Sequence, residues 1–376
     1  MIRTPTLLIL MCFALIKCST NPLMIYQNLP EPEPDQIGIH FLNVGTGLCV
    51  LIEYPGEEVT PLLYDCGSSK RPSRFSADHL KTQIQQVTAR HGNSVNVVLS
   101  HPHRDHTSLL KHVLEGVNID HLMFGGEFGS YDNYSLGLKR WSGFQRAVLK
   151  PNTSQTSDNP YQQSPVGLLS NAIGGTALDV HIMAVDTYHG TGNISGNAMV
   201  NRDSLVLFFD FGDFSMVLTG DAIDQTEVEM LKFMDDFADF PQRLTLVSAA
   251  HHGSDTNGSS GAYWTHRSDP QIVTYSSGLF FGHPRCDVSN RYFWRDPAHS
   301  TPRLAETLEH ASVCNNDGHF FVFNGKSVKA DIEHAAYGTK VNGDISIYTN
   351  GESIEIHCAQ TAHCGFEEGY VSIESL

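Results

Sequence analysis

The chain has 376 residues, of which 40% are hydrophobic and 17% are charged. This composition excludes an intrinsically disordered chain and is typical of a soluble globular protein with one large domain or two ordinary ones. The formal net charge of −17 argues against a broad nucleic-acid-binding surface, because phosphate backbones are bound by Lys and Arg. A small phosphoester held by metal ions is compatible with this charge.

The N-terminus has the pattern of a secretory signal peptide. Arg3 precedes an apolar run from Leu7 to Ile16, which is too short to span a bilayer. We predict a signal peptide over 1–20, with a buried helix as the alternative, and a proline- and acid-rich linker over 21–36. The protein is therefore expected to be secreted or periplasmic.

Lipid anchoring and a transmembrane domain are not expected. Lys17, before Cys18, stands where a lipoprotein signal has a small residue, and no later segment is long and apolar enough to span a membrane. Six of the eight cysteines follow the signal peptide, an even number that permits disulfides in an exported protein. Cys358 and Cys364 are the favoured pair because they bracket a short loop, and the pairing of the other four stays open.

The first part of the chain reads as strands, a helix and a further strand. Leu80, Ile84 and Val87 recur every three or four positions, which predicts a helix over 77–90. Another helical pattern begins at residue 107. Alternating or short apolar runs predict strands at 37–43, 47–54, 61–64 and 95–100. The segment SHPHRDH begins where the last of these strands ends, and such strand-end loops usually hold the chemistry of α/β proteins.

The second part of the chain opens with a polar segment. Residues 128–200 are rich in Gly, Ser, Asn and Pro, and we predict an exposed insertion or flap there. A helix is expected at 222–237, and residues 319–376 are predicted to be a β-rich extension that packs on the preceding domain. Apolar runs predict strands at 204–212, 214–219, 244–250 and 271–276.

Three apolar strands end in residues that can bind metal ions. In the cluster H-x-H-x-D-H, His101 and His103 can bind one ion, while Asp105 and His106 point to the other side and can bind a second. The later strand ends carry Asp221, which can bridge two ions, and His251-His252. A polar loop with chance histidines explains the cluster but not its recurrence at other strand ends. Imidazole and carboxylate donors suit Zn²⁺ best, with Mn²⁺ or Fe²⁺ as alternatives.

These segments together resemble the metallo-β-lactamase superfamily, and more narrowly its ComEC-like branch of competence proteins. The matching segments run in the family's order between residues 37 and 290: FLNVGTGLCVLI, LLYDCG, SHPHRDH, NRDSLVL, LTGD, AHHGS and FGHP. The resemblance implies an α/β protein, with an αββα four-layer sandwich over 37–318 and a short C-terminal β extension. It also implies that His101 and His103 hold one metal ion, that Asp105 and His106 hold the other, and that Asp221 bridges them.

The resemblance assigns roles to further residues. His252 matches the family's last ligand, which leaves His251 beside the metals or as an alternative ligand. Asp65 in YDCG resembles a buried aspartate that orients a ligand histidine, with a turn-capping aspartate as the other interpretation. His283 in FGHP would face the substrate as a phosphate contact or proton donor, and Asp105 would relay a proton.

The sequence departs from the family at three places. Asn43 and Leu48 stand where the family has Asp, so the pocket and its substrate are expected to differ. A sixth ligand histidine, usual between the cluster and the bridging aspartate, has no clear counterpart. The candidates in range for this ligand are Asn201, His189, His181 and Asp186.

The function that the resemblance implies is a secreted hydrolase with two divalent metal ions. A phosphodiesterase or phosphoesterase is favoured, a nuclease included, in which a hydroxide bridging the metals attacks phosphorus. We expect a small phosphoester or a nucleic-acid-derived substrate, without a stable nucleic-acid complex. The alternatives are an amide or lactone hydrolase and a non-catalytic metal-binding surface protein.

Overall fold

The computed structural model describes the chain over residues 29–57, 59–69, 76–126, 130–131, 148–149, 170–187, 196–278, 281–293, 335–359 and 371–372. The predicted signal peptide, most of the predicted linker, His189 and Cys364 lie outside these ranges.

The first sheet is mixed and contains the N-terminal strands. Its order is β16-β15-β14-β1-β2-β3-β4-β5-β6, antiparallel from β16 to β3 and parallel from β3 to β6. Its strands are β1 (Ile37–Phe41), β2 (Cys49–Glu53), β3 (Leu62–Cys66), β4 (Ser94–Leu99), β5 (Asn118–Phe124), β6 (Val148–Leu149), β14 (Ile345–Thr349), β15 (Ser353–Cys358) and β16 (Val371–Ser372). Every residue of β1, β2 and β3 is buried, because the sheet is covered on both faces.

The second sheet is also mixed and faces the first. Its order is β13-β12-β11-β10-β9-β8-β7, parallel from β13 to β10 and antiparallel beyond. Its strands are β7 (Asn171–Ile173), β8 (Thr176–Ala184), β9 (Val206–Phe211), β10 (Phe214–Leu218), β11 (Leu246–Ser248), β12 (Ile272–Tyr275) and β13 (Ala335–Gly338).

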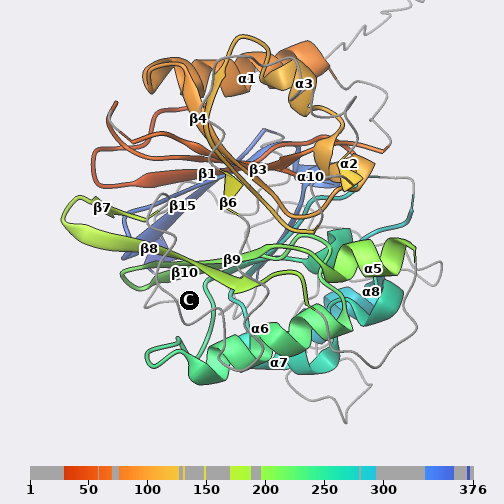
Figure 1. Ribbon diagram of the computed structural model, residues 1–376. Coiled ribbons are helices and arrows are strands. Elements are labelled where there is room, and N and C mark those ends of the chain that lie inside the picture. Colours follow the sequence, from red (N-terminus) through yellow and green to blue (C-terminus); the bar gives the residue numbers. More distant parts are fainter. Residues whose placement is uncertain are drawn as a thin grey trace, which may run out of the picture.

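Helices cover the outer face of each sheet (Figure 1). The first sheet carries α1 (Ala77–Arg90) and α3 (Leu110–Val113), and the second carries α5 (Asn197–Arg202), α6 (Asp224–Asp236), α7 (Ala262–Ser268) and α8 (Cys286–Phe293). Two short helices, α2 (Arg104–Thr107) and α10 (Thr339–Asn342), follow strand ends. One apolar core lies between the sheets, and one lies under each helix layer. The predicted αββα four-layer sandwich is confirmed.

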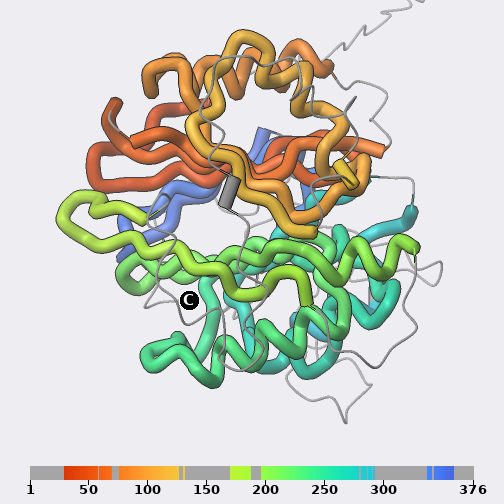
Figure 2. The backbone as a smooth tube through the Cα atoms, in the orientation of Figure 1, coloured from red at the N-terminus to blue at the C-terminus, as the bar shows by residue number. Residues whose placement is uncertain are grey.

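Two segments predicted to be peripheral contribute to the sheets. Within 128–200, β7 and β8 join the second sheet by pairing with each other and with β9. Most other residues of the predicted insertion or flap lie outside the described ranges, so that assignment stays a prediction. Beyond residue 318, β13 extends the second sheet and β14 pairs with β1 in the first. Figure 2 shows these C-terminal strands, in blue, beside the earliest strands, in red. The described part of this segment therefore contributes strands to both sheets, and the predicted boundary at residue 319 stays a prediction.

One disulfide lies between neighbouring strands of the first sheet. Cys49 and Cys66 face each other across β2 and β3 and are bonded. Cys358 is disulfide-bonded as well, while its predicted partner Cys364 lies outside the described residues. Within the part of the chain that is described, no helix combines the length and the apolar character needed to cross a membrane.

Candidate metal centre

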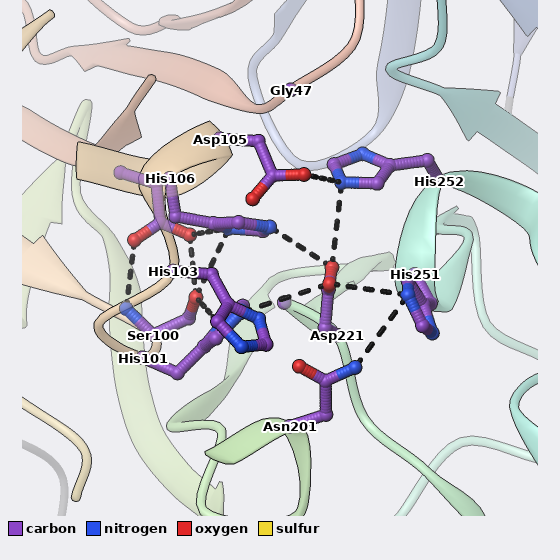
Figure 3. A network of polar contacts seen from close by, with 12 residues as sticks. Gly47, Ser100, His101, His103, Asp105, His106, Asn201, Asp221, His251 and His252 are labelled. Atoms are coloured by element: carbon purple, nitrogen blue, oxygen red, sulfur yellow. Dashed lines mark hydrogen bonds and ion pairs between the residues drawn. The ribbon is translucent and has the colours of Figure 1, made fainter. Parts of the chain in front are cut away.

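The ends of four strands meet at one edge of the sandwich. Asp65 lies in β3, the histidine cluster follows β4, Asp221 follows β10, and His251 and His252 follow β11. Figure 3 shows, gathered around the Asp221 carboxylate, the side chains of His101, His103, Asp105, His106, His251 and His252. Because β3 and β4 are parallel neighbours in one sheet and β10 and β11 in the other, their carboxyl ends bring residues that are distant in sequence to the same edge.

The segment that carries the histidine cluster lies in close backbone contact with two glycines. A Cβ atom at Gly67 would lie 2.4 Å from the Thr107 nitrogen, and one at Gly47 would lie 2.6 Å from the Asp105 carbonyl oxygen. Glycine at both positions lets α2 pack directly on the turns that flank β2 and β3. The Leu48 N–H also donates to the Asp105 carbonyl, at 3.0 Å. The turn of α2 therefore points Asp105 away from the two preceding histidines.

The side chains form two groups whose ligand atoms lie within 4.8 Å of one another. Group one consists of His101, His103 and Asp221, and group two consists of Asp105, His106 and His252. These are the six residues that the sequence predicts as ligands, and the pairs His101–His103 and Asp105–His106 fall in separate groups as predicted. The structure thus provides two adjacent sets of donors of the kind that bind divalent metal ions.

Asp221 lies between the two groups. Its Oδ1 is 3.0 Å from His106 Nε2 and 3.6 Å from His252 Nε2, and its Oδ2 is 3.7 Å from His101 Nε2. Burial alone would raise the pKa of Asp221, but the surrounding imidazoles outweigh it and hold the pKa well below its usual range. The carboxylate is therefore ionised and reaches both groups, as a bridging ligand must.

Asp65 orients the histidines from behind. Its Oδ2 lies 2.7 Å from His106 Nδ1, so we assign the proton to Nδ1, which leaves Nε2 for a metal. The Ser100 hydroxyl donates to the same carboxylate at 2.6 Å and must accept from His101 Nδ1 at 2.9 Å, which leaves His101 Nε2 for a metal too. Burial opposes a charge on His106, but Asp221 and Asp65 outweigh it and raise its pKa.

Among the described residues, His103 Nε2 and His252 Nε2 are buried without a hydrogen-bond partner, while His101 Nε2 and His103 Nδ1 face each other at 3.0 Å. Unsatisfied buried polar atoms cost free energy, on the order of 1–3 kcal/mol each, and here they converge. His252 Nδ1 donates to the Ser276 carbonyl at 2.8 Å, which again turns Nε2 inward. Two divalent ions fit this donor set.

His251 lies on the side of group one. Its Nε2 is 3.6 Å from Asp221 Oδ2 and 3.5 Å from Asn201 Nδ2. His251 and His252 have φ angles of 52° and 59°, a left-handed conformation that costs non-glycine residues roughly 1–3 kcal/mol each and persists only where the surroundings enforce it. This backbone turns both imidazoles toward Asp221 although the residues are adjacent in the chain.

Two other candidates for the sixth ligand, His181 and Asp186, contact residues outside the ligand groups. His181 stacks on Phe208, with ring centroids 5.9 Å apart, and also contacts Phe233 and Phe237 under α6. Asp186 accepts a hydrogen bond from the Gly126 N–H. Asn201 and His251 therefore remain the candidates whose side chains reach group one.

His283, Leu48 and Asn43, which the sequence also singles out, belong to neither ligand group. Pro284 packs against Gly253, and the charges of His252 and His251 add to burial in lowering the pKa of the half-buried His283 to about 4. Leu48 is buried in the core between the sheets, and the Asn43 N–H donates to Asp344 at 2.7 Å. Neither residue belongs to a ligand group, although the Leu48 N–H donates to the Asp105 carbonyl, and their influence on the pocket stays a prediction.

Sequence reasoning missed Ser100 and Ser276, which orient the ligand histidines. Ser100 has a sequence signal, because it directly precedes His101 at the end of an apolar strand. Ser276 acts through its backbone carbonyl, and no residue type is specific to that role.

Comparisons with known proteins show no matching family model and no matching curated protein. Among solved structures, CmlA, a diiron β-hydroxylase from Streptomyces venezuelae, is 14% identical with a TM-score of 0.37, covering 70% of this chain and 51% of its own. Tm1679, a metal-dependent hydrolase of the β-lactamase superfamily, is 14% identical with a TM-score of 0.36, covering 68% and 93%. A long form RNase Z from yeast is 12% identical with a TM-score of 0.34, covering 66% and 38%. The site assignment therefore stands on the residues and geometry of this chain.

Proposed function

We propose that this protein is a hydrolase with two divalent metal ions and that its substrates are phosphoesters, phosphodiesters above all. The observation that carries this proposal is the sharing of Asp221 between two ligand groups. Two such ions, Zn²⁺ by preference and Mn²⁺ or Fe²⁺ as alternatives, would supply Lewis acidity for a phosphoryl oxygen and for water.

Each proposed ion has its own set of ligand residues, with Asp221 shared between the two sets. His101, His103 and Asp221 would hold metal one, and His251 is the residue that we propose as its further ligand, since its Nε2 faces Asp221 at 3.6 Å. Asp105, His106 and His252, together with Asp221, would hold metal two. Asp65 and Ser100 fix the tautomers that leave Nε2 of His106 and His101 inward.

Two residues are proposed to act on the substrate. The Asp105 side chain is 22% exposed, so it can both face group two and receive a proton from solvent or substrate. His283 is half-buried, and its buried Nδ1 has no hydrogen-bond partner among the described residues, which suits a contact to a phosphoryl oxygen. The net charge of −17 favours a small phosphoester over a long nucleic acid.

Membership of the ComEC-like branch and export remain part of the proposal. The motif order supports the branch, and the buried Cys49–Cys66 disulfide agrees with an oxidising compartment. Sequencing the N-terminus of protein from the extracytoplasmic fraction tests export. A mature chain that begins near residue 21 would support it, and an intact N-terminus on protein found only in the cytoplasm would contradict it.

The decisive experiment couples metal analysis to a substrate panel. We expect about two ions per chain and hydrolysis of bis-p-nitrophenyl phosphate that is lost on chelation and restored by Zn²⁺ or Mn²⁺. His103→Ala should remove both activity and one ion, whereas His121→Ala, at a half-buried histidine that contacts Asn96, should leave both unchanged. Turnover of a cephalosporin or lactone with none of a phosphodiester would overturn the proposed substrate class, and digestion of single-stranded DNA would identify a nuclease.

A further inference from the structure

A buried carboxylate on α6 lies outside both ligand groups. Glu227 is 4% exposed, and its two oxygens accept the backbone N–H groups of Ser260, at 2.5 Å, and Gly261, at 2.9 Å. Helix α6 begins three residues after Asp221. Glu227 therefore links the segment that follows Asp221 to the loop that follows His251 and His252.

The loop from residue 251 to residue 261 needs such a support. Besides the two histidines, Asn257 and Ser260 have positive φ angles, of 55° and 54°, so four non-glycine residues of this loop adopt the left-handed region. Arg291 donates to the Ser260 carbonyl at 2.9 Å. The contacts made by Glu227 and Arg291 thus hold both polar backbone groups of Ser260, the last strained residue of the loop.

One side chain of the loop, that of Ser259, contacts His251. The Ser259 hydroxyl lies 3.4 Å from His251 Nδ1 and donates to the Thr256 carbonyl at 2.9 Å. Ser259 precedes the anchored Ser260 directly and is fully buried. The position of its hydroxyl therefore follows from the anchor, and the hydroxyl contacts the ring nitrogen of His251 on the far side from Asp221.

We infer that Glu227 is a positioning residue for His251, holding the loop from 251 to 261 so that the imidazole faces Asp221 and group one. The inference rests on the proposed metal site but not on the proposed substrate. His252 is less dependent on this anchor, because the Ser276 carbonyl holds it from the other side. Loss of the anchor should therefore weaken metal one more than metal two.

The chemistry of Glu227 permits a conservative test. Burial raises the pKa of this carboxyl to about 8, although the two backbone N–H groups act against the rise. A carboxylate accepts with both oxygens, whereas the amide of Glu227→Gln keeps one acceptor and turns a donor toward a backbone N–H. Glu229→Gln makes the same change two residues further along α6 at a half-buried position, and it serves as the matched control.

The experiment titrates metal-free protein with Zn²⁺ and, separately, with Co²⁺, whose visible absorption reports its ligands. It is done above about pH 8, where the wild-type carboxyl is ionised. We expect Glu227→Gln to weaken one of the two ions, assigned as metal one, by about 10- to 100-fold, as loss of a ligand's support does, and to change the Co²⁺ spectrum of that ion. Ser259→Ala should shift both readouts in the same direction by less, and Glu229→Gln should shift neither.

Wild-type affinities and an unchanged Co²⁺ spectrum in Glu227→Gln would overturn the inference. If that variant fails to fold, Ser259→Ala decides, because it leaves the anchor in place, and an unchanged spectrum there overturns the inference as well. These readouts need no substrate. A wild-type protein that binds two ions and cleaves no phosphoester would therefore contradict the proposed function and leave the role of Glu227 standing.

Discussion

Two buried clusters of this molecule combine imidazoles with a carboxylate. Of these two, the cluster around Asp221 has the donor arrangement of a metal site. The first is the metal centre around Asp221. The second, the Glu53 cluster, consists of His40, Glu53, Arg90 and His91 on the outer face of the first sheet beside α1. Arg90 donates two hydrogen bonds of 2.7 Å to Glu53, and His91 and His40 lie 3.4 Å and 3.9 Å from its oxygens.

The difference between the clusters is the fixed cation. In the Glu53 cluster the charge of the carboxylate is already balanced by a guanidinium, and Arg90 and His91 outweigh burial to lower the pKa of Glu53. Asp221 pairs only with imidazoles, and among the described residues no lysine or arginine forms an ion pair with it. A buried carboxylate surrounded by convergent imidazoles leaves positive charge to be supplied by metal ions.

The largest effect should follow from Asp221→Asn. The amide loses the negative charge that both groups share, so we expect at least about a 1000-fold fall in kcat/KM on a phosphodiester, about 4 kcal/mol of transition-state stabilisation. Metal content per chain should fall with it, measured by elemental analysis. Asp213→Asn, in an exposed turn, is the control. A variant that keeps two ions per chain would show that Asp221 does not bridge.

Glu53→Gln should have the opposite profile. Removing one partner of a buried ion pair leaves the other charge uncompensated, and because Arg90 is 25% exposed we expect a loss of about 3 kcal/mol in the free energy of unfolding. Metal content and activity of the folded protein should be unchanged. Urea unfolding and elemental analysis of the same preparation measure the two effects. A fall in metal content without a change in stability would contradict the prediction that the Glu53 cluster supports stability and not metal binding.

His40 gives the Glu53 cluster a pH dependence of its own. Burial lowers its pKa to about 4, although Glu53 acts against that shift while Arg90 adds to it. Because the folded pKa lies below the unfolded value near 6.5, the unfolded state binds more protons between these values. Stability should be fully present above about pH 6.5 and fall by about 3 kcal/mol as the pH approaches 4.

Urea unfolding of metal-free protein across this pH range measures that fall, and His40→Gln should flatten it. Subtracting the variant's curve from the wild-type curve cancels the contribution of the metal-site histidines, which both proteins share. Parallel curves for the two proteins would show that His40 is not the group responsible.

The smallest of the predicted effects concerns Asp65, the carboxylate behind the ligands. Asp65→Asn should weaken metal binding by about 10- to 100-fold, because the amide is a poorer acceptor for His106 Nδ1 and Ser100. Asp65 has a φ of 53°, a conformation that asparagine tolerates, so the backbone should be retained. Competition with a chelator measures the affinity. Unchanged affinity would favour the turn-capping interpretation of Asp65.

The part of the fold that could be predicted is the part with local signals. The helix over 77–90 is observed with the predicted bounds, and the strand leading to His101 ends one residue early, at Leu99. Residues 171–184 lie in a segment rich in Gly, Ser and Asn, whose composition predicts an exposed insertion, and the structure places them in β7 and β8. Pairing of β8 with β9 at long range decides their structure, and no local pattern reports such pairing.

The candidate site also has features with local sequence signals and features set only by long-range contacts. The six donors could be named because each follows an apolar strand. The disulfide between Cys49 and Cys66 could not be deduced, because only the register of β2 and β3 places the two residues opposite each other. The position of His251 beside group one was also left open, because a left-handed backbone at a histidine has no signature in the sequence.

The sequence by itself determined which atoms are available to hold metal ions and at which strand ends they lie, since strand patterns and donor types are local properties of the chain. Only the tertiary structure decided that Asp221 is shared, that Asp65 and Ser100 select the inward nitrogens, and that Glu227 anchors the loop behind His251. Apart from the contact between the adjacent residues Ser100 and His101, these contacts join residues 6 to 120 positions apart. They exist only once the two sheets pack and bring their strand ends to one edge.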